Sequence, residues 1–465
     1  MPLVAGVDSS TQSTKVVVRD ATDGSLVRQA QAPHPDGTEI HPDVWWQALA
    51  KACAGELLAD VAAISVAAQQ HGMIVLDEDN QVIRPALLWN DTRSASATSD
   101  LITELGGSQA WAEAVGSVPT PSFTIGKLRW LTEHEPDHAR RAQQVMLPHD
   151  WLTLQLTGQV VTDRGDASGT GYYSPTRGYR RELLRLAFGG DLTVPRVAEP
   201  AAALAPAADQ TVFSGNMVAA GTGDNMAAAL ALDPHPGDVV VSLGTSGTAF
   251  AVTTTPSADP SGHVAGFADA TGNYLPLVCT LNAARVPQAA AHLLGRDHHQ
   301  FDQLALGAEP GAGGLSLLPY LEGERTPNLP EATGRLDGIT TTNLTPQNLA
   351  RAYCEGMLCG LAEAVDALAQ QGVPVARVLL VGGAARSAAV RAIAPQVFAR
   401  PVAIPENREY VADGAARQAA WALSGAEQPP IWAGTSEAEI HEAEPAPQIR
   451  ERYAHARAEL VHRHS

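Results

Sequence analysis

Residues 7–18 read VDSSTQSTKVVV, and residues 241–252 read VSLGTSGTAFAV. Each stretch runs from apolar residues through a tight polar turn into a second apolar run, the pattern of a β-hairpin. Ser, Thr and Gly in the turns let backbone N–H groups approach an anion. Thr11 and Thr245 lie about half the chain length apart, which predicts two similar halves. Two ordinary hairpins would give the same pattern, so the repeat alone leaves both interpretations open.

Outside the hairpins, short β-branched runs alternate with longer helical stretches, which predicts an α/β fold. Apolar runs predict strands at residues 16–18 and 239–241, which belong to or adjoin the two quoted stretches, and at 62–66 and 378–381. A helix is expected over residues 44–58, after Pro42 and Asp43.

The Ala- and Pro-rich stretch 194–208 predicts a connector and a domain boundary near mid-chain. We therefore expect an N-terminal domain over 1–215, a C-terminal domain over 216–430 and a tail over 431–465. A tail helix should begin near Pro447, with its apolar face packing back onto the first domain.

The net charge of the chain argues against some classes of binding partner. The 465 residues include 31 Lys and Arg against 50 Asp and Glu, a net charge of −19. Nucleic acids and anionic membranes are bound through clustered Lys and Arg, so we expect neither partner. Four Cys without metal-ligand spacing fit a reducing cytoplasm, and no apolar run approaches the roughly 20 residues of a membrane span. A cytoplasmic location is expected.

Polar clusters follow two of the apolar runs. Gln70 and His71 come after the expected strand 62–66, and Trp89, Asn90 and Asp91 come after the apolar residues 86–88. Amide, imidazole and carboxylate groups satisfy sugar hydroxyls, and a Trp face covers the C–H side of a sugar. Turn residues with His71 and Trp89 in the core would explain each cluster equally well.

Two glycine-rich turns lead into helices. Residues 221–225, GTGDN, precede an Ala-rich helix at 226–232, where Asp224 is either an N-cap or a carboxylate that another molecule can approach. Residues 381–387, VGGAARS, follow a strand and open a helix. The second turn is typical of a nucleotide platform, although strand-Gly-Gly-helix turns are common without one.

The order of these motifs, from Val4 to about Ala420, resembles the FGGY carbohydrate kinases, most closely the branch that phosphorylates xylulose. The first family signature matches at Ser122, Thr124, Lys127, Leu128, Trp130, Leu131, Glu133 and His134. The second matches at Gly334, Leu336, Gly338, Ile339, Asn348, Leu349, Ala352 and Glu355, with departures at Tyr353 and Cys354. LPYLEGERTP at 318–327 and LWND at 88–91 also fit that branch.

The resemblance implies two ribonuclease-H-like domains of the actin-like ATPase fold, with an active-site cleft between them. Asp224 would be the catalytic base and Asp8 its acidic partner, both near the metal, in part through water. The implied sugar contacts are Gln70, His71, Trp89, Asn90, Asp91 and Asp224. The implied nucleotide contacts are Ser10, Thr11, Lys15, Gly244, Thr245, Gly382, Gly383, Ala384 and Ser387. Many relatives have Met in place of Gln70 and Asn in place of Ser387.

The activity that the resemblance implies is Mg²⁺- and ATP-dependent phosphorylation of D-xylulose to D-xylulose 5-phosphate by in-line transfer. Ribulose, gluconate or glycerol would be the alternative substrates. A non-catalytic, actin-like ATP-binding sensor is an alternative of another class, and the Asp224 motif together with the sugar-type clusters favours the kinase. The expected partners are a small sugar and ATP, with a homodimer left open.

Overall fold

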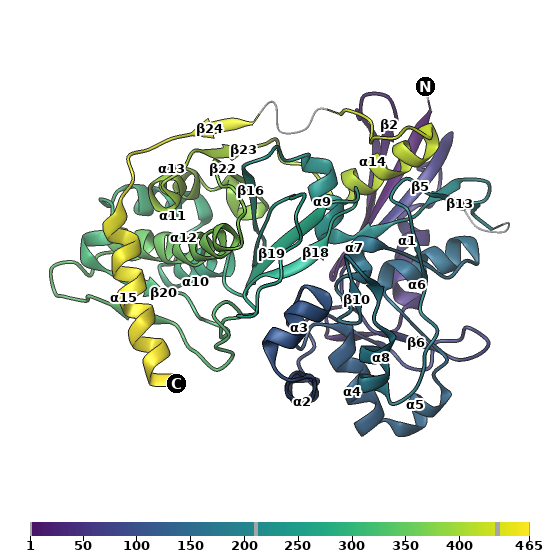
Figure 1. The fold of residues 1–465 in the computed structure, drawn as a ribbon. Helices are drawn as coiled ribbons and strands as arrows, with labels where there is room; N and C mark the ends of the chain where they lie inside the picture. The colour runs from purple at the N-terminus through teal and green to yellow at the C-terminus, as the bar shows by residue number, and fades with distance from the viewer. Residues whose placement is uncertain (1, 209–212, 433–437, 465) are drawn as a thin grey trace. The chain divides into compact units, whose positions relative to one another are not determined.

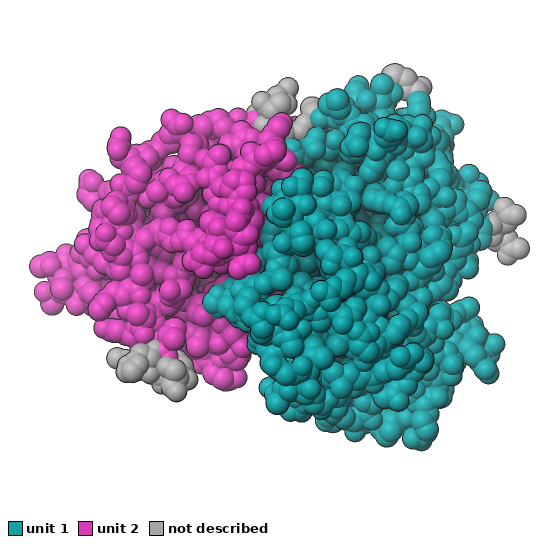
Figure 2. All heavy atoms as spheres, viewed as in Figure 1, with its two compact units in different colours: residues 1–233, 252–276, 408–434 teal, residues 234–251, 277–407, 435–465 magenta. Residues whose placement is uncertain are grey.

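The computed structural model describes residues 2–208, 213–432 and 438–464. Their contacts divide the chain into two units, coloured separately in Figure 2. Unit 1 comprises Met1–Asp233, Val252–Pro276 and Arg408–Gly434, and unit 2 comprises Pro234–Ala251, Leu277–Asn407 and Thr435–Ser465. Within the described ranges, no helix combines the length and the apolar character needed to cross a membrane.

Unit 1 is built on one mixed sheet. Its strands are β1 (Leu3–Ser9), β2 (Ser13–Asp20), β3 (Leu26–Pro33), β5 (Val61–Ala68), β13 (Ala203–Pro206), β14 (Met217–Ala219) and β15 (Thr222–Gly223). The order is β13-β14-β5-β1-β2-β3, and β15 pairs with the end of β5. β1 runs antiparallel to β2 and parallel to β5. The first quoted stretch is therefore the β1–β2 hairpin.

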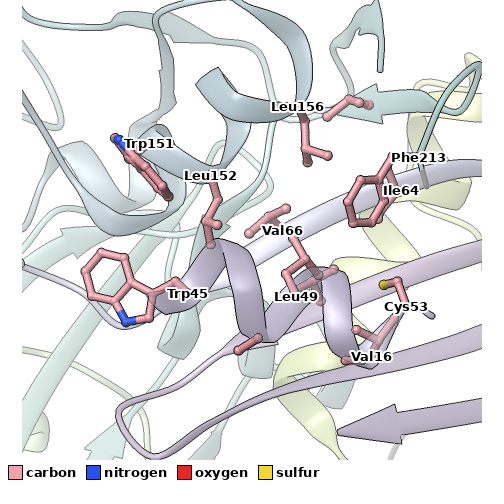
Figure 3. Close-up of a cluster of buried hydrophobic side chains, with 14 of the residues drawn as sticks. Val16, Trp45, Leu49, Cys53, Ile64, Val66, Trp151, Leu152, Leu156 and Phe213 are labelled. Atoms are coloured by element: carbon pink, nitrogen blue, oxygen red, sulfur yellow. The ribbon is translucent and has the colours of Figure 1, made fainter. Parts of the chain in front are cut away.

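One face of this sheet is covered by α1 (Asp43–Ala52). Because successive strand side chains point to opposite faces, Val16 of β2 and Val66 of β5 join Trp45 and Leu49 of α1 in one buried cluster (Figure 3).

The opposite face of the sheet is covered by α14 (Tyr410–Ser424) (Figure 1). Val17 of β2 packs there against Ala side chains of the helix. The approach is so close that a Cβ on Gly6 of β1 would lie 1.9 Å from the Ala412 carbonyl oxygen. Small residues on both elements therefore allow α14 to pack closely on the sheet.

Unit 1 also contains further helices and short strands. They are β4 (Glu39–Ile40), β6 (Ile74–Leu76), β7 (Ala86–Leu87), α2 (Ala95–Leu105), α3 (Ser108–Val115), α4 (Thr124–His134), α5 (Pro136–Arg141), β8 (Gln144–Met146), α6 (Pro148–Thr157), β9 (Val161–Asp163), α7 (Arg164–Ala167), β10 (Tyr173–Ser174), β11 (Gly178–Tyr179), α8 (Arg181–Phe188), β12 (Arg196–Ala198), α9 (Asp224–Leu232) and β18 (Ala265–Ala268).

Unit 2 repeats the central topology of unit 1. Its sheet contains β16 (Asp238–Leu243), β17 (Gly247–Phe250), β19 (Tyr274–Thr280, in unit 2 from Leu277 onward), β22 (Arg377–Val381), β23 (Val402–Ile404) and β24 (Glu439–His441). The order is β19-β17-β16-β22-β23-β24. β16 is antiparallel to β17 and parallel to β22, as β1 is to β2 and β5. The predicted repeat and the two ribonuclease-H-like domains are confirmed.

Helices and short strands complete unit 2. They are α10 (Arg285–Leu293), α11 (His298–Leu306), η1 (Ala312–Gly314), β20 (Ser316–Leu318), β21 (Arg335–Asp337), α12 (Pro346–Gln370), η2 (Gly383–Arg386), α13 (Ala388–Phe398) and α15 (Pro447–His464). The apolar face of α15 is buried, and the helix contacts β20 and α12 of its own unit. The expectation that the tail packs on the first domain is therefore wrong, because this face covers unit 2.

Two local expectations also need correction. The helix expected over 44–58 ends at Ala52, and the chain then turns through Gly55 at φ +75°. The expected connector 194–208 contains β12 and β13, and β13 pairs with β14 at the sheet edge. The four expected strands fall within β2, β5, β16 and β22.

Candidate active site

Asp8 lies near the end of β1, in the middle of the unit 1 sheet. Its carboxylate is 4% exposed and accepts a hydrogen bond from Ser10 Oγ at 2.5 Å. Burial raises the pKa of Asp8 to about 6, and Glu409 adds to the rise while Ser10 and Lys15 oppose it. Lys15 is itself paired with Glu409, with 2.6 Å between Nζ and Oε2. The first hairpin therefore carries a carboxylate, Asp8, that is harder to ionise than a carboxylate in solvent.

Asp224 is the first residue of α9, and Gly223 is the N-cap, so the lone-cap interpretation of Asp224 is wrong. Its Oδ1 accepts from the backbone N and the Nδ2 of Asn225 at 2.7 and 2.8 Å. Burial and then the charge of Asp8 raise the pKa of Asp224 to about 7, against these hydrogen bonds. The structure brings the two predicted catalytic acids within electrostatic reach of each other.

Gln70 joins the Asp224 group. Asn225 Nδ2 donates to the Gln70 Oε1 at 2.9 Å, and Gln70 is 4% exposed. Its Nε2 has no hydrogen-bond partner among the residues that the structure describes. A buried amide N–H of this kind needs an acceptor, which a ligand oxygen would supply.

His71 is fixed from several sides. Its backbone is left-handed, with φ +69°. The ring stacks on Phe123 with centroids 4.8 Å apart, and Nδ1 lies 2.7 Å from the Gly169 carbonyl oxygen. A carbonyl only accepts, so Nδ1 donates and neutral His71 carries its proton there. Gly169 leaves room for this ring, because a Cβ at that position would lie 2.7 Å from it.

Trp89, Asn90 and Asp91 are held by separate contacts. Trp89 Nε1 donates to Thr11 Oγ1 at 3.0 Å, which ties the second polar cluster to the first hairpin. Asn90 Nδ2 donates to the Gly37 carbonyl at 3.3 Å. Asp91 is buried and accepts from the backbone N and Nε of Arg93 at 3.0 and 2.9 Å. Asp91 thus has a structural ion pair, and its sugar contact stays a prediction.

In unit 2, the predicted phosphate and adenosine turns adjoin each other. Gly382 has φ +93°, and a Cβ there would lie 2.7 Å from the Leu243 carbonyl oxygen, one residue before Gly244. The Gly244 and Thr245 carbonyls accept from the backbone N of Ala284 and Ala283 at 2.9 and 3.3 Å. The turn at Gly244 and Thr245 is therefore held from two directions.

The residues that follow Gly382 differ in how much free space surrounds them. A Cβ on Gly383 would meet no atom of the described residues within 4 Å, so its surroundings within them are open. Ala384 follows it within η2. The Ser387 hydroxyl caps α13 through the backbone N of Val390 at 3.1 Å and donates to Asp302 at 2.6 Å. Ser387 already has this structural role, and its nucleotide contact remains a prediction.

The family signature contains two residues whose role is visible only in the structure. Thr124 Oγ1 and Lys127 Nζ both donate to the carbonyl oxygen of His71, at 3.1 and 3.3 Å. Both residues are fully buried. They brace the strained backbone of His71, and the sequence signal for this role is a lysine inside an apolar helical stretch.

A buried charged cluster at His149, Asp150, Asp163 and Asp166 was not predicted from the sequence. It connects to the Asp224 turn through Thr222, whose Oγ1 donates to Asp163 at 2.7 Å. Its members come from α6, β9 and α7, and no spacing along the chain marks them as one group.

Two family models cover most of the chain. The N-terminal domain of the FGGY family of carbohydrate kinases matches residues 3–231, and the C-terminal domain matches residues 239–423. A xylulose kinase of Streptomyces coelicolor is 49% identical over 91% of this chain and 89% of its own length. A xylulose kinase of Haemophilus influenzae is 33% identical over 90% of both chains.

Solved structures agree with this assignment. The xylulose kinase of Bifidobacterium adolescentis superposes with a TM-score of 0.89 at 42% identity, covering 98% of this chain and 99% of that one. Glycerol kinase of Plasmodium falciparum shares the fold, with a TM-score of 0.84 at 16% identity and coverage of 100% and 98%. The chain belongs to the FGGY family of carbohydrate kinases.

Proposed function

We propose that this carbohydrate kinase transfers the γ-phosphoryl group of ATP to the C5 hydroxyl of D-xylulose, giving D-xylulose 5-phosphate and ADP. The observation that carries the proposal is Asp224, a carboxylate with a pKa of about 7, next to Asp8 and to the Asn225–Gln70 contact. The choice of sugar rests on relatives named xylulose kinase, one of them 49% identical.

Asp224 acts in this proposal as the general base. It accepts the proton of the C5 hydroxyl while that oxygen forms a bond to the γ-phosphorus and the bond from phosphorus to the ADP oxygen breaks. A carboxylate that titrates near neutral pH is suited to this step, because it is both ionised and basic enough to take a proton. Positioning and charge stabilisation supply the rest of the acceleration.

The residues present fit a magnesium ion. Mg²⁺ prefers oxygen ligands, keeps several waters and is held by one or two carboxylates, which Asp8 and Asp224 offer. The charge of Asp8 raises the pKa of Asp224, and a bound cation would relieve that repulsion. When bound, the ion neutralises charge on the phosphate oxygens. Asp8 is held for this role by Ser10 Oγ at 2.5 Å.

We assign the sugar to unit 1 and the adenosine to unit 2. Gln70, His71 and Trp89 give unit 1 amide, imidazole and aromatic groups for a polyhydroxylated ligand. In unit 2, the open surroundings of Gly383 and the adjoining turn at Gly244 and Thr245 support a nucleotide site. Ser10, Thr11 and Lys15 of the first hairpin, together with Gly244 and Thr245, are assigned to the phosphates.

The proposal is tested by measuring ADP release with a coupled assay across D-xylulose, D-ribulose, D-gluconate and glycerol. We expect kcat/KM for D-xylulose to exceed each of the others at least tenfold. A higher value for another substrate would reassign the sugar. ATP binding without ADP release, whichever sugar is added, would favour the non-catalytic ATP-binding sensor instead.

A further inference from the structure

A buried charged cluster adjoins the turn that carries Asp224. His149 Nδ1 lies 2.7 Å from Asp166 Oδ2 and 3.3 Å from Asp150 Oδ1, and His149 Nε2 lies 4.0 Å from Asp163 Oδ1. All four residues are at most 3% exposed. One imidazole therefore faces three carboxylates without access to solvent.

The imidazole supplies the positive charge of this cluster. Burial opposes protonation, yet the carboxylates of Asp150, Asp166 and Asp163 together raise the pKa of His149 to about 9. His149, Asp150 and Asp166 have ligand atoms within 4.8 Å of one another. An imidazole must be neutral to bind a metal, so a proton shared between Nδ1 and Asp166 competes directly with a metal ion.

Asp163 links the cluster to the chain around it. Its Oδ1 accepts from the backbone N of Asp166 at 2.9 Å, and its Oδ2 accepts from the backbone N of Gly165 at 2.8 Å. Asp163 is thus the N-cap of α7. Oδ2 also accepts from Thr222 Oγ1 at 2.7 Å, which is the third hydrogen bond to this carboxylate. This contact joins a charged carboxylate to the strand that immediately precedes Asp224.

The Thr222 strand has little freedom to move. β15 pairs in parallel with β5, and Thr222 lies level with Ala67, which also lies level with Asp8 of β1 on the other side. A Cβ on Gly221 would lie 2.7 Å from the His149 ring, and a Cβ on Gly165 would lie 2.8 Å from Met226. His149 of the cluster and Gly165 of α7 therefore lie close against the two sides of the turn.

From this geometry we propose that Thr222 is a positioning residue for Asp224. Its hydrogen bond to Asp163 fixes β15, and β15 in turn fixes the first residue of α9. The assignment rests on the proposed function, in which Asp224 is the base. In this assignment Thr222 contacts no substrate, and it fixes the position of the Asp224 carboxylate.

The test compares Thr222→Val, which removes the hydroxyl and keeps the shape, with Thr222→Ser, which restores the donor. We expect Thr222→Val to lower kcat roughly tenfold, the order of loss for a misplacement well under 1 Å, with KM for D-xylulose and for ATP within twofold of wild type. Thr222→Ser should recover at least half of the wild-type kcat. The melting temperature should fall by only a few degrees, because Asp163 Oδ2 keeps its bond from Gly165.

Thr153→Val is the matched control. Thr153 is a fully buried threonine of α6 whose hydroxyl has no hydrogen-bond partner in the described part of the chain. The kcat of Thr153→Val should stay within twofold of wild type. If Thr222→Val does not fold, Thr222→Ala removes the same hydroxyl with a smaller side chain.

The outcomes separate this assignment from the proposed function. A wild-type kcat in Thr222→Val, with Asp224→Asn inactive, would overturn the role of Thr222 alone. A Thr222→Ser variant as slow as Thr222→Val would also overturn it, because the hydroxyl would not be the working group. Turnover retained in Asp224→Asn would contradict the proposed function and, with it, this assignment.

Discussion

His71 is held in place by two residues of the family signature, Thr124 and Lys127, and by two residues that the sequence did not mark, Phe123 and Gly169. Thr124 and Lys127 hold its carbonyl, Gly169 accepts from its ring, and Phe123 stacks on it. A left-handed backbone costs of order 1–3 kcal/mol at a residue other than glycine. The surrounding contacts offset this cost, as is typical of a side chain whose direction matters.

Replacing His71 with Asn tests its contact with the sugar. Asn tolerates a left-handed backbone, so the fold should survive, but its side chain is shorter. We expect kcat/KM for D-xylulose to fall by about 1–3 kcal/mol in transition-state terms, the range for leaving a buried polar partner unmet. KM for ATP should change less than twofold in steady-state kinetics.

The control for this variant is His41→Asn, at an exposed position of the same unit whose side chain is 44% exposed. It should match wild type in both substrates. Unchanged D-xylulose kinetics in His71→Asn would assign His71 to the core and remove it from the sugar site.

At this scale the sequence predicted the types of residue better than their partners. Gln70 could be chosen as a polar residue after a strand, and Asp224 as a carboxylate in a glycine-rich turn, whereas the role of Asp8 came from the family resemblance. The structure connects all three through Asn225 and the charge of Asp8. Thr222 could not be chosen, because its importance depends on Asp163, which lies far from it along the chain.

The turn at the start of η2 contains two neighbouring glycines, Gly382 and Gly383, that differ in the space around them. Gly382 has φ +93° and no room for a Cβ, whereas Gly383 has open surroundings. We expect Gly383→Val to fold normally and to lower ATP affinity at least tenfold, because the added side chain occupies space assigned to adenosine. Calorimetric titration should show D-xylulose affinity within twofold of wild type.

A valine at Gly190 is the matched control, since a Cβ there lies 3.9 Å from its nearest neighbour, Phe188. It should change neither affinity. Loss of both ligands in Gly383→Val would indicate misfolding, and wild-type ATP affinity would remove Gly383 from the nucleotide site.

Helix and strand boundaries were predicted well where residues close in sequence determine them. They were predicted less well where contacts with distant segments determine them. The helix expected over 44–58 stops at Ala52, and Gly55 follows in a left-handed turn, although Cys53 and Leu57 still belong to the same buried cluster. β13 is stabilised by pairing with β14, a partner that no local pattern shows. The hairpins β1–β2 and β16–β17 are local in sequence, and both were predicted.

At the scale of the whole molecule, each unit is formed by segments that are not continuous in sequence. Later segments of the chain join a unit formed mostly by earlier ones, and the linear order of the residues does not show this. The segment 408–434 packs α14 on β1 and β5, more than 340 residues away along the chain from the end of β5 at Ala68. Its Ala-rich face is a weak hydrophobic signal, and the fit depends on Gly6. The expected domain boundaries at residues 215 and 430 assume continuous domains. They therefore could not place residues 408–430 in unit 1.

The buried charges predict how stability changes with pH. The folded pKa of His149, about 9, lies above its unfolded value of 6.5, so its stabilising contribution is present below pH 6.5 and is lost as pH rises through 9. Burial also raises the pKa values of Asp224 and Asp150 to about 7. These acids bind protons more tightly in the folded state, so their effect has the same sign up to pH 7.

We therefore expect the free energy of unfolding to fall between pH 6 and pH 9, lowering the melting temperature by about 5 °C. Calorimetric scans at matched ionic strength would measure this. The slope above pH 6.5 should be smaller in His149→Gln, which separates the imidazole from the general repulsion of a chain with net charge −19. Equal melting temperatures at pH 6 and pH 9 would contradict a protonated, buried His149.

The kinase account as a whole depends on Asp224 as the group that takes the sugar proton. Asn keeps the shape of Asp224 and can still accept from the backbone N of Asn225, so Asp224→Asn should fold and bind both substrates. The control is Asp79→Asn, an exposed change in the same unit, which should behave as wild type.

The most direct test is the turnover of Asp224→Asn with D-xylulose and ATP, measured beside its melting temperature and its affinity for each substrate. The account predicts a loss in kcat of roughly 10²–10⁴-fold, the usual contribution of a positioned general base, with binding and melting temperature close to wild type. Wild-type turnover in this folded variant would contradict the account.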